Sequence, residues 1–281
     1  MPTIRYREPL NVLVVAKGHP YLRDPFMAMF DTLEGMACTL VEQPAAQGLM
    51  NVASMRGFDV LVLYDMPGLD FKVSDPPGFV DPTPEFKNGF LALLDSGIGV
   101  VALHHAIAGW PAWEEYAQLL GGRFLYKADK LLGTSRLDSG YRHEVTHTVT
   151  AADEDHPILQ GIEFPLTLRD ELYLFEVFED LVEPLLRSDY SFDRQNFYSA
   201  QLAVKGHMFD NKAWNHAPGS NLVGWTKKAR RSPLCYLQPG DGPETYGNPQ
   251  YQRLVENSIR WVASAAARKW AQDGVATKKT K

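Results

Sequence analysis

Cysteine is scarce in this sequence, and long apolar runs are missing from it. The 281 residues include two cysteines, Cys38 and Cys235, and no CxxC spacing. This scarcity excludes a disulfide scaffold and a zinc site built from thiolates, and it is typical of a reducing compartment. No apolar run approaches the ~20 residues that cross a bilayer, and the first residues do not resemble a signal peptide. We therefore expect a cytoplasmic protein with no membrane partner.

Positive charge is also limited. The net charge is -6 at pH 7, and the main basic cluster is the short stretch KKARR at residues 227–231. Because phosphate binding needs a clustered basic surface, nucleic acid is excluded as the main partner. Hydrophobic residues make up 45% and charged residues 22% of the chain, as in an ordinary globular protein. The length suits a single α/β domain.

Strand and helix signals alternate in the first half of the chain. Short apolar runs predict strands at residues 11–16, 37–42, 58–65 and 98–103. Capping residues followed by proline, or proline alone, predict helix starts at Asp24-Pro25, Thr83-Pro84, Pro111 and, near the end, Asn248-Pro249. This alternation predicts a parallel sheet with right-handed crossovers. The strands that start near Asn11, Phe58 and Ile98 should be parallel neighbours.

The pattern changes between about Gly121 and Ser220. Residues 142–150 alternate strictly, which predicts a half-exposed strand with His143, His147 and the intervening Val145 on one side. His143 and His147 would lie ~13 Å apart at ~3.3 Å per residue, so they cannot share a metal ion, and we interpret both as structural. We expect one domain over residues 1–281, with an elaborated middle, a core of about 11–263 and a tail at 264–281.

Ionisable residues follow several of the predicted strands, at the sheet edge where open parallel sheets bind ligands. They are His19, Asp65, His104, His105 and Asp241. Imidazole moves protons near neutral pH, and carboxylates orient it. A single histidine or aspartate at a strand end is more often a capping group. The adjacent pair His104-His105 is the strongest candidate, because neighbours leaving a strand point in different directions and one can face the cleft.

Other polar residues have a structural interpretation. The pair Asp170-Glu171 precedes an aromatic-rich strand, where such a pair is usually solvated, although it could reach the cleft if the middle segment folds back. His207 and His216 lie in a polar, irregular stretch typical of surface loops. The sequence Asp155-His156-Pro157 is typical of a turn or a helix start.

Four motifs in order resemble the trehalose-utilisation (ThuA-like) family. They are GIGVVALHHAIAGW at 97–110, WEEYAQLLGGRF at 113–124, DEDHPILQGI at 153–162 and DELY at 170–173, within a resemblance that covers Asn11 to Ala263. This family belongs to the class I glutamine amidotransferase-like superfamily. The resemblance implies a flavodoxin-like three-layer sandwich with a mainly parallel central sheet. In related amidotransferases the fourth strand leads into a sharp turn with a nucleophilic cysteine. His104 matches the cysteine position here, so we expect no thiolate chemistry.

The resemblance also implies a function in carbohydrate catabolism. It implies an enzyme that acts on a disaccharide or a keto-sugar derivative, by hydrolysis or isomerisation. His105 would then be the general acid or base, His104 would orient it or bind substrate, and Glu171 and Asp241 would be carboxylate partners.

Sugar binding, metal and assembly are further expectations. His19, Asp65 and Trp110 are candidates for binding the sugar. A divalent metal such as zinc, held by imidazole and carboxylate, is a variant of the same site, although no spacing demands it. The alternative function is a non-catalytic sugar-binding or regulatory module on the same fold, and the sequence leaves a homo-oligomer open.

Overall fold

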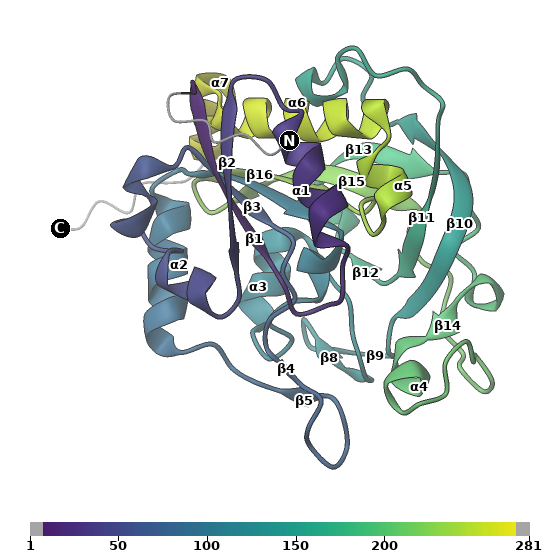
Figure 1. The fold of residues 1–281 in the computed structure, drawn as a ribbon. Coiled ribbons are helices and arrows are strands. Elements are labelled where there is room, and N and C mark those ends of the chain that lie inside the picture. Colours follow the sequence, from purple (N-terminus) through teal and green to yellow (C-terminus); the bar gives the residue numbers. More distant parts are fainter. Residues whose placement is uncertain (1–7, 274–281) are drawn as a thin grey trace.

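A computed structural model describes residues 8–273 and contains a large central sheet (Figure 1). The sheet has ten strands in this part of the chain. Nine lie in the order β11 (Leu166–Leu174), β10 (Gly140–Ala151), β13 (Glu183–Ser188), β15 (Leu222–Ala229), β16 (Ser232–Leu237), β6 (Gly99–Leu103), β3 (Val60–Leu63), β1 (Leu10–Ala16) and β2 (Met36–Glu42). The tenth, β14 (Tyr198–Ser199), pairs with β10. Smaller pairs are β4 (Leu69–Asp70) with β5 (Gly78–Phe79), β7 (Gly122–Arg123) with β12 (Glu176–Val177), and β8 (Asp129–Leu131) with β9 (Thr134–Arg136).

Helices connect and cover these strands. They are α1 (Arg23–Asp31), α2 (Pro84–Asp95), α3 (Glu114–Leu120), α4 (Ala200–Val204), α5 (Pro243–Tyr246), α6 (Pro249–Ala263) and α7 (Ala265–Gln272). Thr83 and Asn248 cap α2 and α6 as predicted, because their side chains accept hydrogen bonds from the first turn. Two helices begin at residues other than the predicted ones. Asp24 lies inside the first turn of α1, and α3 begins three residues after Pro111, behind a turn closed by the Trp113 N–Trp110 O hydrogen bond.

One side of the sheet is parallel. Strands β16, β6, β3, β1 and β2 run in the same direction, and Val60 of β3 pairs with both Val12 and Gly99. The strands predicted near Asn11, Phe58 and Ile98 are therefore parallel neighbours, as expected. Strands β15, β13, β10 and β11 continue the sheet in antiparallel pairing. Three of them, β10, β11 and β13, belong to the elaborated middle segment.

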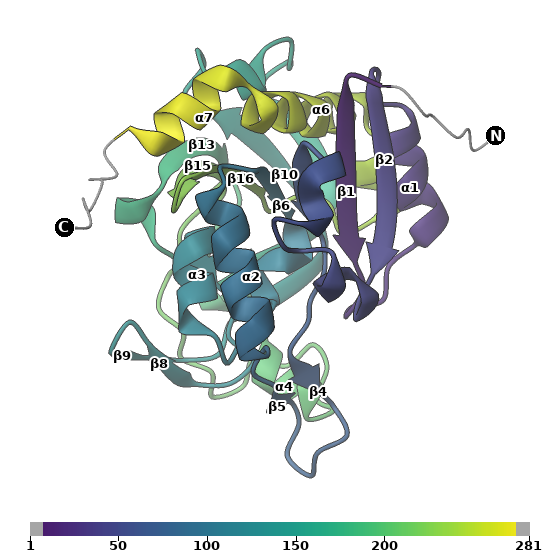
Figure 2. The ribbon, with the colours of Figure 1, turned by 90° about the vertical axis from the view of Figure 1, so that its left-hand side faces the viewer.

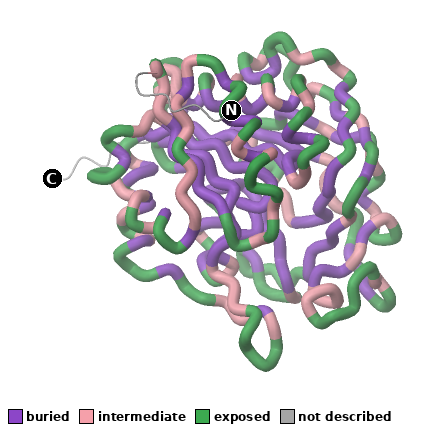
Figure 3. Tube along the Cα trace, viewed as in Figure 1, coloured by how far each residue is buried: buried purple, intermediate pink, exposed green. Residues whose placement is uncertain are grey.

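The parallel strands separate two hydrophobic cores. Alternate residues point to opposite faces, so Val12 packs with α1 and α6 while Leu13 packs with α2 and α3. Figure 2 shows these two pairs of helices on opposite sides of the strands, and Figure 3 shows the strands buried between them. This is the expected three-layer α/β sandwich, and the order β2-β1-β3-β6-β16 of its parallel strands is flavodoxin-like.

The segment expected to be a tail begins with α7. Ala267 and Ala271 of this helix are buried, and α7 packs on β15 and β16. Residues 274–281, with the terminal lysines, lie outside the described residues. Within residues 8–273, no helix is long and apolar enough to span a membrane.

A β-bulge interrupts β10. Arg142 pairs with Leu172 and Val145 pairs with Asp170, so two residues, His143 and Glu144, lie opposite Glu171 alone. Glu144 has a positive φ of 55°. The predicted strict alternation is therefore wrong at this point. Val145 and His147 are buried, whereas the His143 side chain is 40% exposed.

His147 should make stability depend on pH. Its Nδ1 lies 2.8 Å from Ser188 Oγ, and burial lowers its pKa to about 4, against the opposing charge of Asp189. The unfolded chain, with a histidine pKa near 6.5, binds the extra proton first as pH falls. The contribution of His147 to the free energy of unfolding is therefore fully present above about pH 6.5 and is lost as pH falls toward 4. Between pH 7 and pH 5, we expect the free energy of unfolding to fall by about 1–2 kcal/mol more for wild type than for His147→Leu.

Urea unfolding of both proteins at the two pH values measures this difference. His207→Leu is the matched control, because His207 is exposed and its replacement should leave the pH dependence unchanged. If the free energy of unfolding falls equally for wild type and His147→Leu between pH 7 and pH 5, this imidazole is not the group that titrates.

Candidate functional site

The two adjacent histidines occupy a sharp turn at the end of β6. The strand ends at Leu103, and a 3-10 turn (His104–Ala108) follows directly. His104 has a φ of 33°, a region that residues with a side chain rarely adopt. The hydroxyl of Tyr236 donates to the His104 carbonyl at 3.1 Å and holds the turn. The predicted sharp turn after the fourth strand is therefore present, and we call it the elbow. It places both imidazoles at the carboxyl edge of the parallel strands.

His104 is held by two acceptors. Its Nδ1 lies 2.5 Å from the Gln238 carbonyl oxygen, and its Nε2 lies 3.1 Å from Glu171 Oε2. A carbonyl and a carboxylate both accept, so both ring nitrogens carry hydrogen and the ring is positively charged. Burial opposes this charge, but the hydrogen bond to Glu171 and the charge of Asp241 raise the pKa of His104 to about 9.

His105 has the opposite character. Burial, with the charge of His104, lowers its pKa well below the usual value. Its Nδ1 lies 3.2 Å from the Tyr173 hydroxyl, and its ring lies against Tyr64 and His19, with ring centroids 4.7 and 4.3 Å away. The buried Nε2 has no hydrogen-bond partner among the described residues. This nitrogen is therefore available to another group.

Glu171 joins two histidines. It lies opposite the bulge of β10, where its Oε1 is 3.0 Å from His143 Nδ1 while its Oε2 contacts His104. Burial alone would raise the pKa of Glu171, but the hydrogen bond and charge of His104 lower it. The carboxylate is ionised and is only 4% exposed. The usual solvated position of an Asp-Glu pair does not apply, because the middle segment folds back over the sheet edge.

Asp170 fixes the loop that carries Asp241. Its carboxylate accepts hydrogen bonds from the backbone N–H groups of Gly240 at 2.6 Å and Asp241 at 3.0 Å. Gly240 has a φ of 127°, and a Cβ there would lie 2.2 Å from the Tyr251 hydroxyl, so only glycine fits. Asp241 Oδ1 consequently lies 3.7 Å from His104 Nε2 and 3.6 Å from His105 Nε2.

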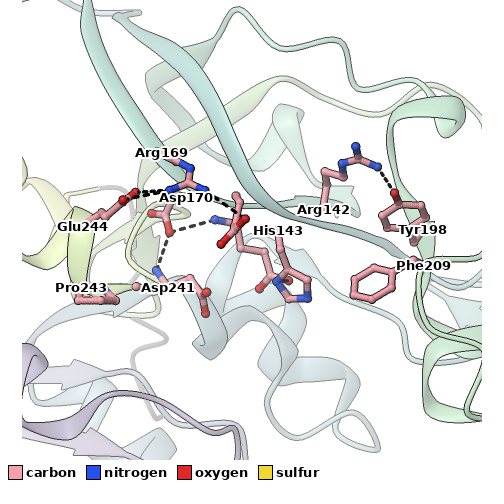
Figure 4. A pocket seen from close by; sticks show the side chains of 12 residues that line it. Arg142, His143, Arg169, Asp170, Tyr198, Phe209, Asp241, Pro243 and Glu244 are labelled. Atoms are coloured by element: carbon pink, nitrogen blue, oxygen red, sulfur yellow. Dashed lines mark hydrogen bonds and ion pairs between the residues drawn. The ribbon is translucent and has the colours of Figure 1, made fainter.

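Two cavities meet at His143 and Glu171. The larger has a volume of about 770 Å³ and is lined mainly by polar and charged residues (Figure 4). Figure 4 shows Arg169 beside Glu244 toward one end, Arg142 beside Tyr198 toward the other, and His143 between them. The smaller cavity, of about 210 Å³, has mainly apolar walls, including Phe124, Tyr126 and Met208.

The structure separates the three predicted sugar-binding residues. His19 joins the histidine cluster and lines the smaller cavity. Asp65 is buried, accepts a 2.7 Å hydrogen bond from Gln43, and has its pKa raised to about 7 by burial. Trp110 is buried, with its ring centroid 5.3 Å from that of Phe86. Neither Asp65 nor Trp110 lines either cavity.

The remaining histidines differ from one another. His207 is exposed, as predicted, but His216 is buried, because its ring packs on Trp214 and its Nδ1 contacts the Ala217 carbonyl. His156 accepts a hydrogen bond from Ile158 N and caps a short turn, as predicted.

The sequence interpretation missed His143 and Tyr173 as site residues. His143 is not a purely structural residue of an alternating strand, because the bulge brings it to Glu171. No local pattern indicates that bulge. Tyr173 follows Glu171 by two residues, and the strand period that places both on one face could have indicated it.

Among residues 8–273, two groups of side chains could hold a metal ion. One is His19, His105 and Asp241, and the other is His104, Glu171 and Asp241, with one donor atom per residue and all donors of a group within 4.8 Å of one another. The second group is less suitable, because the Nε2 of His104 carries a hydrogen directed at Glu171. Neither group contains a cysteine.

Comparison with known proteins shows what the chain resembles. A search of the curated proteins finds no match. Among solved structures, a ThuA-like protein from Parabacteroides merdae matches with a TM-score of 0.61 and 15% identity, over 92% of this chain and 91% of that one. A cytoplasmic protein from Salmonella typhimurium matches with a TM-score of 0.55 and 10% identity, over 90% and 99%. PurLQS from Thermotoga maritima matches with a TM-score of 0.50 and 13% identity, over 91% and 99%.

These structures share the fold of this chain at low identity. The model of the ThuA family, described as trehalose utilisation, matches residues 11–262, nearly the span of the predicted resemblance. With the elbow, the sandwich and this match together, the chain belongs to the trehalose-utilisation (ThuA) family.

Proposed function

We propose that this protein is a cytoplasmic enzyme of carbohydrate catabolism, which acts on a disaccharide or a keto-sugar derivative by acid-base chemistry. Membership of a trehalose-utilisation family supports the substrate class. A cavity of about 770 Å³ is large enough for such a molecule. The observation that carries the proposal is the chain of contacts His143–Glu171–His104 at the wall of that cavity, in which the two imidazoles lie 3.0 and 3.1 Å from the two carboxylate oxygens.

His143 is the proposed acid-base group. Its Nδ1 contacts the buried Glu171 carboxylate, its side chain is 40% exposed, and it lines both cavities. An imidazole whose one nitrogen is oriented by a buried carboxylate can take up and return a proton through the other nitrogen. The sequence interpretation gave this role to His105, whose ring is only 1% exposed.

Glu171 and His104 position the acid-base group. The Glu171 carboxylate stabilises the cation that His143 becomes when it accepts a proton. His104 holds the other carboxylate oxygen from the opposite side and offsets its buried charge. The same unit serves hydrolysis, where the proton comes from water, and isomerisation, where it comes from the carbon beside a keto group.

The larger cavity offers groups that suit a sugar. Arg169 is paired with Glu244 at 3.0 Å, and such charged groups bind hydroxyls well. The Phe209 ring forms part of the wall, and an aromatic ring can pack against the C–H face of a sugar. Asp65 and Trp110 have no role in this proposal.

Replacing His143 should remove turnover without unfolding the protein. We expect His143→Ala to lower kcat ~10²–10⁴-fold, the usual contribution of a general acid or base. Added imidazole should restore part of the rate, because a small base can occupy the vacated space. The measurement is turnover of trehalose, other disaccharides and their 3-keto forms, beside a thermal melt.

His207→Ala is the control, because His207 is exposed and lines neither cavity. Normal turnover by His143→Ala would contradict the assignment. Binding of sugars by wild type with no turnover of any would favour the alternative, a non-catalytic sugar-binding module.

Alkylation of the cysteines should leave turnover unchanged. The elbow carries His104 in place of a cysteine, and Cys235 is fully buried, with burial raising its thiol pKa to about 12. A buried thiol with a raised pKa reacts slowly. Treatment of the native enzyme with iodoacetamide should leave Cys235 unmodified by mass spectrometry. Protection of either cysteine by substrate would overturn this expectation.

A further inference from the structure

One buried nitrogen of the site has no use in the proposed chemistry. His105 Nε2 lies inside the protein without a hydrogen-bond partner among the described residues, and its ring is 1% exposed. The Tyr173 hydroxyl lies 3.2 Å from His105 Nδ1 and can accept its hydrogen. The hydrogen of the neutral ring is then on Nδ1, and Nε2 presents a lone pair. A buried polar atom left unpaired is destabilising.

Two further electron-pair donors face the same point. His19 Nδ1 lies 2.9 Å from the Pro20 carbonyl oxygen, which fixes the hydrogen on Nδ1 and leaves a lone pair on Nε2. Asp241 Oδ1 lies 3.6 Å from His105 Nε2. One donor atom from each of the three residues falls within 4.8 Å of the others. Three lone pairs that converge with no hydrogen between them repel one another unless a cation lies among them.

We propose that His19, His105 and Asp241 bind a divalent transition-metal ion, for which zinc is the best-fitting choice. Two donors about 2.0–2.2 Å from a tetrahedral zinc lie roughly 3.3–3.5 Å apart, close to the 3.6 Å between His105 and Asp241. Two imidazoles and one carboxylate leave a coordination position open, as in catalytic zinc sites.

The surrounding residues support each ligand. The Pro20 carbonyl and the Tyr173 hydroxyl accept the Nδ1 hydrogens of the two imidazoles, as second partners of metal-binding histidines usually do. Asp170 holds the backbone N–H of Asp241. The His104 hydrogen does not compete for Asp241, because it is directed at Glu171 at 3.1 Å rather than at Asp241 at 3.7 Å.

The ion would complete the proposed site. An open position on a divalent ion polarises a carbonyl or hydroxyl oxygen, and His143 would then move the proton nearby. Only this use of the ion rests on the proposed function. Metal binding itself can be measured without turnover.

A calorimetric titration of the chelator-treated protein with Zn²⁺ tests the site. We expect one ion per chain and a melting temperature that rises with Zn²⁺ concentration. His19→Ala and Asp241→Asn should each weaken binding more than 10-fold, while His207→Ala, at an exposed histidine, should bind as wild type does. Co²⁺ should give a visible absorption band in wild type that both ligand variants lose. Thermal melts without metal confirm that the variants fold.

Absence of a stoichiometric ion, or unchanged affinity in both ligand variants, would overturn the proposal. His143→Ala separates this proposal from the proposed function, because it should bind Zn²⁺ normally while it loses turnover. If His143→Ala keeps full turnover and the ligand variants lose the ion, the acid-base assignment fails and the metal site stands.

Discussion

The buried carboxylate of Glu171 is the constraint on which the site depends. An ionised carboxylate this far from water is tolerated only when partners offset its charge. His104 supplies a positive charge on one oxygen, and His143 Nδ1 lies 3.0 Å from the other. The arrangement keeps the His104 imidazole positively charged. Removal of either partner would leave part of a buried charge unbalanced, so these three residues form one unit.

Neither half of the sheet forms this unit alone. The parallel half supplies the elbow with His104 and His105, and the antiparallel half supplies Glu171 from β11 and His143 from β10. Asp170 joins the two halves, because it lies in β11 and accepts hydrogen bonds from the backbone of the loop after β16. The middle segment therefore contributes residues to the site and is not only an insertion into the α/β fold.

Sequence reasoning predicted the parallel half well, because buried strands and capped helices leave local signals. Thr83 and Asn248 cap helices where expected, and the elbow follows β6. Long-range geometry was harder to predict. The bulge that brings His143 to Glu171 depends on pairing between β10 and β11, and no local pattern reports it. The ring of Trp110 predicts an apolar face for a sugar, but Trp110 packs against Phe86 and lines neither cavity.

The spread of the site along the chain has a consequence for biosynthesis. Its residues lie at positions 19, 104, 143, 171 and 241, and the His104–Gln238 hydrogen bond alone closes 134 residues of chain. Contacts of such separation form late and slowly, since the entropy of loop closure must be overcome first. A ribosome-bound fragment that lacks β16 has no acceptor for His104 Nδ1 and no Asp241. The site is consequently complete only after synthesis has passed Asp241 and the two halves of the sheet have joined.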